Sequence, residues 1–214
     1  MMMMRLCAVA ALVALAAPAA AQTAVVDGTK FRYAVPDGYC SLDLNQSGHR
    51  QLFEQTASKI AAQDLKLVVG FNTCMELAAL GAKAPRNAAP DGMISVLARS
   101  GKQVARLGLS RREFLGHIRE RHKPVDWGAA ETELEALAEG EGKLVRLGIL
   151  GEDDRAVYVG TALRSSGGVY ANLVAFTLAE GRAFQISLTR PLEGRASFET
   201  LLSQERAMVA ALRP

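Results

Sequence analysis

The last third of the chain constrains the fold most, because it alternates apolar stretches with very short polar turns. The turns lie at residues 152–154, 165–168 and 180–181. Connections this short join only antiparallel neighbours, since a parallel crossover needs a dozen residues or more. The apolar stretches therefore predict a four-stranded antiparallel meander, with strands over 144–150, 156–163, 169–178 and 183–188.

Helical spacing of apolar residues predicts helices around this meander. The best-defined start is Ser110, where Glu113 completes a capping box, and Pro124 ends that helix near His122. Three further helices are predicted by apolar periodicity, over 47–63, 126–139 and 197–212. The last of these should cover one face of the meander, because its apolar side needs a partner surface.

Short extended segments are predicted in the first half of the chain. Asp27-Gly28 is a two-residue hairpin signal, and apolar residues alternate after it over 31–35. Paired β-branched residues predict buried strands over 67–71 and 93–98, and 75–82 has room for one or two helical turns. The fold class is therefore α+β, with an antiparallel sheet, a C-terminal four-stranded meander and covering helices.

The first 21 residues have the layout of a secretory signal peptide. Arg5 supplies a positive charge before an unbroken apolar run, Pro18 ends the run, and small residues follow as far as Ala21. A bilayer-spanning helix needs about 18 consecutive apolar residues, and this run is shorter. We therefore expect cleavage after Ala21, a mature chain over 22–214 without a transmembrane segment, and a periplasmic or secreted location.

The mature chain has the size of one domain and almost no net charge. Removing 21 of 214 residues leaves 193, and no linker-like stretch divides them. Without Arg5 the count is 24 basic against 22 acidic residues, a net charge of +2 with histidine neutral. Such a balance implies neither a nucleic acid nor a strongly acidic partner. A single, monomeric or weakly associating domain is expected.

Charge is unevenly distributed in the middle of the chain. A basic segment comes first and an acidic one follows: Lys102, Arg106, Arg111, Arg112, Arg119, Arg121 and Lys123, then Glu131, Glu133, Glu135, Glu139 and Glu141. The two predicted helices either pair in an antiparallel hairpin or leave the basic helix free to face anionic lipid or a partner protein. In the second case Arg112, Arg119 and Arg121 form a contact surface, although solvated helix faces often have this composition.

Two cysteines, Cys40 and Cys74, remain after removal of the signal peptide. An exported chain enters an oxidising compartment, where such a pair predicts a disulfide. Each cysteine follows a predicted extended segment, so the bridge would connect the two segments. Two buried free thiols are the alternative, because cysteine is often buried as a small hydrophobe.

One stretch near the start resembles the PsbP-like group of proteins. Residues 31–39, Phe-Arg-Tyr-Ala-Val-Pro-Asp-Gly-Tyr, are similar to the aromatic strand, Val-Pro-x-Gly turn and second aromatic that open these domains. The late meander and the C-terminal helix are also similar. The resemblance implies an α/β/α sandwich and a role as an accessory or assembly factor rather than an enzyme. The group includes bacterial periplasmic proteins of unassigned role. It carries no functional residue over to this chain.

The sequence contains no catalytic or metal-binding motif that we can assign. His117 and His122 are five residues apart, about 140° around a helix, and do not converge on one metal. His49 stands alone and is expected to be a solvated polar residue. No serine has the flanking glycines of a nucleophile elbow, and the acids at 152–154 are explained by a polar turn rather than by calcium.

The sequence thus predicts an exported accessory or binding module without a cofactor, whose partner is an unidentified protein of the cell envelope. The alternative class is an envelope enzyme whose site is assembled from scattered residues. A deep pocket with converging acids and a perturbed pKa would favour the enzyme. A flat exposed patch would favour the module.

Overall fold

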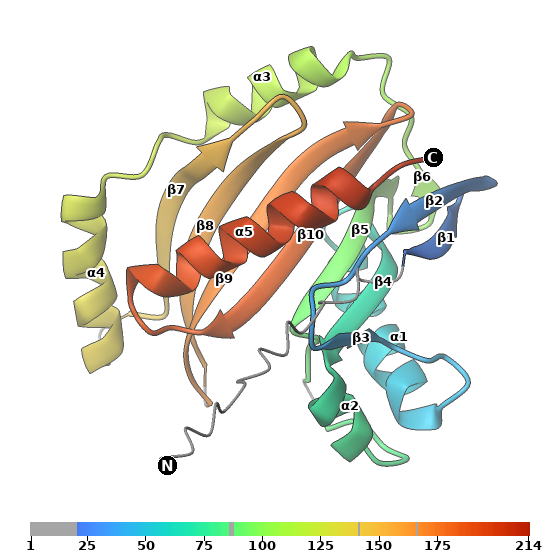
Figure 1. Cartoon of the computed structure of the whole chain (residues 1–214), viewed down its shortest axis with the longest axis horizontal. Coiled ribbons are helices and arrows are strands. Elements are labelled where there is room, and N and C mark those ends of the chain that lie inside the picture. Colours follow the sequence, from blue (N-terminus) through green and yellow to red (C-terminus); the bar gives the residue numbers. More distant parts are fainter. Residues whose placement is uncertain (1–20, 86–87, 141, 166) are drawn as a thin grey trace, which may run out of the picture.

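An eight-stranded antiparallel sheet is the frame of the molecule (Figure 1). The computed structural model describes residues 21–85, 88–140, 142–165 and 167–214, so the predicted signal peptide lies outside them except for Ala21. The strand order is β3-β4-β5-β10-β9-β8-β7, with β6 paired to β5. The strands are β3 (Tyr39–Ser41), β4 (Leu65–Thr73), β5 (Gly92–Arg99), β6 (Gln103–Val104), β7 (Leu144–Glu152), β8 (Ala156–Ser165), β9 (Gly168–Ala179) and β10 (Arg182–Pro191).

The C-terminal meander is confirmed, because β7, β8, β9 and β10 pair in sequence order. Its last turn places Glu180 and Gly181 at φ of 49° and 68°, the left-handed values of a two-residue hairpin turn. The meander joins the first half of the chain where β10 pairs with β5, Phe184 lying opposite Val96. One continuous sheet therefore combines residues from both halves.

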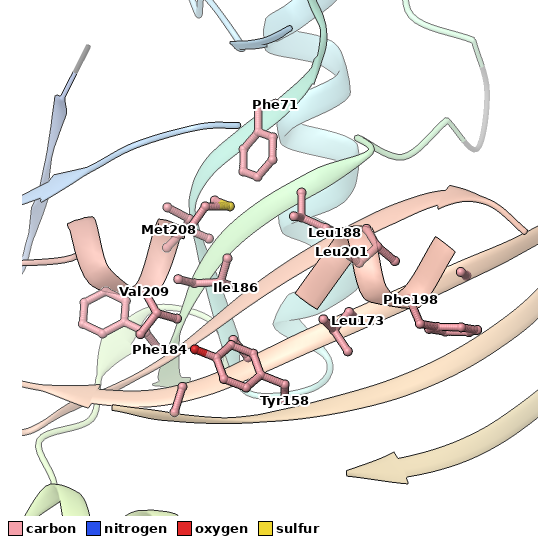
Figure 2. Packing of buried hydrophobic residues seen from close by; sticks show 14 of the residues in the cluster. Phe71, Tyr158, Leu173, Phe184, Ile186, Leu188, Phe198, Leu201, Met208 and Val209 are labelled. Carbon is pink, nitrogen blue, oxygen red and sulfur yellow. The ribbon is translucent and has the colours of Figure 1, made fainter. Parts of the chain in front are cut away.

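One face of the sheet is covered by the C-terminal helix α5 (Arg195–Ala211) and by α4 (Trp127–Glu139). Figure 2 shows Phe198, Leu201, Met208 and Val209 of α5 directed at the sheet residues Leu173, Ile186 and Leu188. The helix starts and stops follow local signals, since Asp126 caps α4 and Gly140 ends it at φ 111°. This face holds the main hydrophobic core, as the amphipathic pattern of residues 197–212 predicts.

The other face carries two helices over separate apolar clusters. α1 (Ser47–Ala61) covers Leu65 and Leu67 of β4, and α3 (Arg111–Arg121) covers Val157 and Val159 of β8. The predicted capping box is present at the start of α3, where Ser110 and Glu113 bond reciprocally. A short helix, α2 (Cys74–Ala79), follows β4 and packs Leu77 beside α1.

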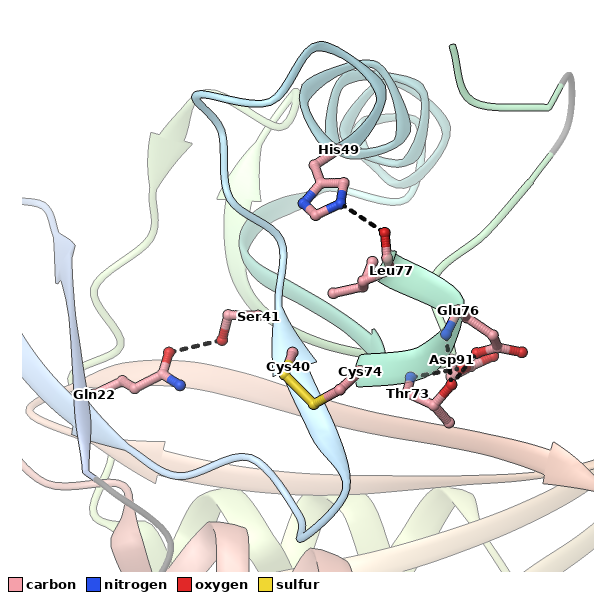
Figure 3. The surroundings of a disulfide bond; sticks show 9 residues. All are labelled: Gln22, Cys40, Ser41, His49, Thr73, Cys74, Glu76, Leu77 and Asp91. Carbon is pink, nitrogen blue, oxygen red and sulfur yellow. Dashed lines mark hydrogen bonds between the residues drawn. A yellow bond between two sulfur atoms is a disulfide. The ribbon is translucent and has the colours of Figure 1, made fainter. Parts of the chain in front are cut away.

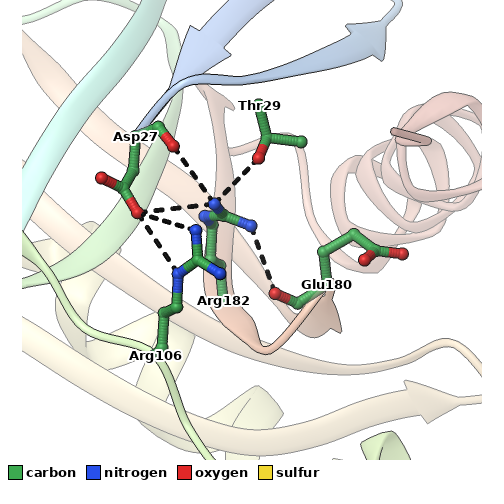
Figure 4. A network of polar contacts seen from close by, with 5 residues as sticks. All are labelled: Asp27, Thr29, Arg106, Glu180 and Arg182. Atoms are coloured by element: carbon green, nitrogen blue, oxygen red, sulfur yellow. Dashed lines mark hydrogen bonds and ion pairs between the residues drawn. The ribbon is translucent and has the colours of Figure 1, made fainter.

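A separate hairpin of β1 (Gln22–Val26) and β2 (Thr29–Tyr33) lies on the same face as α5. Its turn is held by Arg182, whose Nη2 donates to the Asp27 backbone oxygen at 3.3 Å and to Thr29 Oγ1 at 2.9 Å (Figure 4). The guanidinium is buried and also lies over the Phe31 ring, 5.6 Å from its centroid. The outer edge of β2 is bonded to Arg213, which exchanges two backbone hydrogen bonds with Arg32.

The outer edge of β7 is covered by the segment that connects α3 to α4. Ile149 N donates to Lys123 O at 2.8 Å, and Val125 N donates to Ile149 O at 3.0 Å. Gly148 has φ 95°, and a Cβ atom at this position would overlap the Lys123 carbonyl. A glycine is therefore required for the connector to approach the strand this closely.

Candidate functional site

The predicted contact residues Arg112, Arg119 and Arg121 all lie on α3 and are all exposed. Arg119 Nε donates to Glu152 Oε2 on β7 at 2.6 Å, so its charge is matched within the chain. Among the described residues no ion pair involves Arg112 or Arg121. The apolar side of α3, with Phe114, Leu115 and Ile118, packs on the sheet, which leaves the basic side facing solvent.

The basic and acidic helices do not form the antiparallel hairpin that their charges permit. Their apolar sides pack on opposite faces of the sheet, α3 against Val157 and Val159, and α4 in the core with α5. In the part of the chain that the structure describes, no salt bridge joins the two helices. The acids of α4 are exposed and stand apart from α3, at Glu131, Glu133, Glu135 and Glu139. Charge therefore remains segregated in space as it is in the sequence.

The expectation of a solvated His49 is wrong. The side chain is 4% exposed and bridges three segments of chain. Figure 3 shows its contact with Leu77 of α2. Asp43 N donates to its Nδ1 at 3.1 Å, and its Nε2 lies 3.3 Å from Leu77 O, with geometry for donation by the neutral ring. Both ring nitrogens thus have backbone partners, and His49 connects α1 to α2.

The other two histidines do not converge on one site. His117 is exposed, and its Nδ1 lies 3.4 Å from Glu120 Oε2. His122 stacks on Phe176, with 6.0 Å between ring centroids. Among the described residues there is no group of three or more His, Cys, Asp or Glu side chains placed to hold a metal ion.

The acidic turn at 152–154 is held by its own hydrogen bonds. Asp153 accepts from Arg155 N at 2.8 Å, from Ala156 N at 2.9 Å and from the Tyr158 hydroxyl at 3.0 Å. Burial alone would raise the pKa of Asp153, but these donors outweigh it and the pKa is lowered. The geometry is that of a polar turn.

The sulfur atoms of Cys40 and Cys74 lie at bonding distance, and the two Cα atoms are 4.8 Å apart (Figure 3). This is within the range that a disulfide spans without backbone movement. Cys40 lies in β3 and Cys74 begins α2, so the bridge ties the outermost strand to the helix that follows β4. The cysteines are in position for the predicted bond.

Two carboxyl groups share a polar cluster beside this bridge, a feature that the sequence analysis missed. Burial, together with the Glu76 carboxylate, raises the pKa of Asp91 from 3.8 to about 7. The hydrogen bond from the Asp91 carboxyl lowers the pKa of Glu76. The two shifts are opposite in direction, so Asp91 keeps its proton to a higher pH than Glu76 does.

The rest of this cluster is also polar. Thr73 N donates to Asp91 Oδ2 at 3.3 Å, and Thr73 Oγ1 donates to Glu76 Oε2 at 2.8 Å. Burial and then Asp91 raise the pKa of Tyr39. A local signal exists for Glu76, because Thr73 and Glu76 have the spacing of a capping box. No sequence pattern near Asp91 predicts its place in this cluster, because Asp91 directly precedes β5 and lies beside Glu76 only in the folded chain.

A second acid is buried in the main core. Glu205 of α5 is 0% exposed and accepts from Leu188 N at 3.1 Å through Oε1. Its Oε2 has no partner in the described part of the chain. Burial raises the pKa of Glu205 well above its usual value, and the side chain serves to satisfy the β10 amide at Leu188.

Comparison with known proteins yields a distant likeness of fold. No family model matches the chain, and no curated protein sequence matches it. The solution structure of cyanobacterial PsbP (CyanoP) from Synechocystis sp. PCC 6803 aligns over 95% of this chain and 97% of its own, with 11% identity and a TM-score of 0.41. This likeness is too distant to assign a family or a role. In the described residues no helix is long and apolar enough to cross a membrane.

Proposed function

We propose that the chain is an exported accessory or binding module of the PsbP-like kind, acting in the periplasm or after secretion. In this proposal residues 1–21 are a signal peptide that is removed, and residues 22–214 form one domain. The signal-peptide pattern supports export, as does a cysteine pair placed for a disulfide between residues 34 positions apart.

One observation carries the binding role, which is that α3 presents basic side chains to solvent without acidic partners from α4. Oppositely charged surfaces speed encounter and fix orientation. We propose that Arg112 and Arg121, with Arg119 beside them, contact an acidic surface of an envelope protein.

The test is capture of partners from envelope extract by the mature protein. Replacing Arg112, Arg119 and Arg121 by Ser should abolish retention of the specific partner and lower the salt dependence of binding. A matched control removes three exposed lysines elsewhere, by Lys59→Ser, Lys83→Ser and Lys143→Ser. Equal retention by both triple variants would reject α3 as the contact surface. If the wild type captures no protein but binds anionic liposomes, the contact surface on α3 recognises lipid and the proposed protein partner is rejected.

A further inference from the structure

β1 has a free edge. It pairs only with β2 in the described chain, and its two-residue turn makes Val26 and Thr29 opposite partners. Such a turn closes on a hydrogen-bonded pair, and bonding alternates along an antiparallel ladder. The backbone N–H and C=O groups of Thr23 and Val25 therefore point away from β2, towards the free edge.

β4 is open along the half of its edge nearest to β1. Its outer neighbour β3 pairs only with Phe71, Asn72 and Thr73, and Leu42 N donates to Gly70 O. On the inner side Ala98 N donates to Asp64 O. Alternation from Asp64 leaves the backbone groups of Leu67 directed at the outer edge. A β-bulge between Leu67 and Val69 then reverses the alternation, so that Gly70 also faces outward. No described strand pairs with β4 there.

A groove of about 260 Å³ lies between these two edges. Its walls include the backbone runs 23–26 and 66–70, and Leu44 and Phe53 border it. Val25 is 65% exposed and Leu44 is 45% exposed, so both present apolar surface beside the groove. Lys66 is the charged residue among those that line the groove. The groove thus offers unpaired backbone groups, apolar side chains and one positive charge.

We propose that this groove binds an extended peptide segment of a partner protein by strand addition. The segment has apolar side chains at alternate positions, which meet Val25, Leu44 and Phe53. It also has one acidic residue, which pairs with Lys66. Backbone hydrogen bonds to Thr23, Val25 and Leu67 provide its alignment, as in other modes of peptide recognition that extend a sheet. This site is separate from α3 and is independent of the contact proposed there.

The contrast with β7 supports a binding role. Native proteins cover or disrupt edge strands because an exposed edge pairs with other chains. This protein covers β7 with the connector at Lys123 and Val125, and covers β2 with Arg213. The edges of β1 and β4 are left without such cover although apolar residues surround them.

The experiment uses the mature protein and the peptide acetyl-Thr-Val-Glu-Val-Thr-amide, followed by amide NMR. The amide signals of Thr23, Val25 and Leu67 should shift, and their hydrogen exchange should slow by about 10-fold or more at saturation. The same peptide with its central amides N-methylated cannot donate these bonds, and should bind at least about 10-fold more weakly. Equal binding by the N-methylated peptide would overturn strand addition.

A charge exchange tests the role of Lys66 without disturbing the fold, because Lys66 is exposed. The variant Lys66→Glu should bind the Glu peptide more weakly and a peptide with Lys in its place more tightly, by about 3- to 10-fold each. The matched control, Lys59→Glu on α1, should leave both affinities unchanged. If Lys66→Glu still prefers the Glu peptide to the Lys peptide, the proposed pairing of Lys66 with an acidic residue is rejected.

Two further outcomes would also overturn the proposal. Absence of shifts at Thr23, Val25 and Leu67 up to about 1 mM peptide would exclude even weak binding. Shifts of the same amides on raising the protein concentration alone would assign the groove to a second copy of this chain. The triple variant of α3 should bind the peptide as the wild type does, which separates failure of this site from failure of the proposed function.

Discussion

The sheet has one outer edge that is covered and another that is partly open, and the difference follows from single residues. At β7, Gly148 lets the connector approach until Lys123 and Val125 bond to Ile149. At the other end β3 is only three residues long, and beyond it β4 has no strand partner on its outer side in the described chain. Gly148 thus allows the edge of β7 to be covered. The edge of β4 is covered only as far as the short strand β3, which the cysteine pair holds in place, extends. Protection of an edge is thus a local property that substitutions can add or remove.

The largest effect is expected from removing the proposed disulfide at the open edge. Replacing Cys40 and Cys74 by Ser releases a loop between residues 34 apart, and the chain-entropy model gives a loss of about 4 kcal/mol in the free energy of unfolding. Urea denaturation of the oxidised protein and the double variant measures it. A thiol assay on the unfolded, unreduced protein is the independent check, since two free thiols would contradict the bond.

The next effect is expected at the covered edge. Gly148→Ala places a Cβ at φ 95° against the Lys123 carbonyl, and should lower the free energy of unfolding by about 2 to 3 kcal/mol. It should also speed hydrogen exchange of the Ile149 amide. Gly116→Ala is the control, because this helical glycine has open space around it and should gain up to about 1 kcal/mol. A neutral Gly148→Ala would show that the cover does not need glycine.

A smaller, pH-dependent effect is expected beside the bridge at the open edge. The pKa of Asp91 is about 7 in the folded protein against 3.8 ordinarily, so its contribution to stability is present below about pH 4 and is lost as pH rises through 7. The shift corresponds to about 4 kcal/mol, of which solvent screening at this half-buried site leaves about 1 to 2 kcal/mol.

Asp91→Asn should therefore flatten the decline in stability between about pH 4 and pH 7, which denaturation at several pH values measures. Asp154→Asn provides a control at an exposed acid on the far side of the sheet. If the free energy of unfolding of Asp91→Asn declines with pH as steeply as that of the wild type, Asp91 is not the group that titrates.

The smallest effect is expected for the ion pair between Arg119 and Glu152 of β7. Their side chains are 39% and 51% exposed, and pairs of this kind contribute about 0.5 kcal/mol or less. A double-mutant cycle with Arg119→Ala and Glu152→Ala measures the coupling. A coupling above about 1 kcal/mol would mean that this pair, and not only the connector, fastens α3 to the covered edge.

Elements with local signals were predictable from the sequence. Ser110 and Glu113 form the expected capping box, and Gly140 ends α4 in the expected left-handed conformation. The meander followed from turn length alone, because short turns admit one kind of neighbour. The expected strands over 67–71 and 93–98 lie within β4 and β5.

Features that depend on distant packing were not predictable. His49 is buried because α2 docks against α1, and Asp91 meets Glu76 because β5 lies beside β4. The pairing of the basic and acidic helices failed for the same reason, since the face of the sheet on which a helix packs is not encoded in its own charges. The open edge of β4 was invisible because it depends on where β3 stops.

The meeting of the two ends of the chain has a consequence for the order of folding. Arg32 near the start bonds to Arg213 near the end, and Arg182 holds the turn at Asp27 across 155 positions. Contacts between such distant residues form slowly, because a long loop must close before they repay its entropy. If the chain is delivered N-terminus first, β1 and β2 cannot make their contacts with Arg182 and Arg213 until those residues are available. For a protein exported as proposed, the domain completes its fold only after its last residues have been exported.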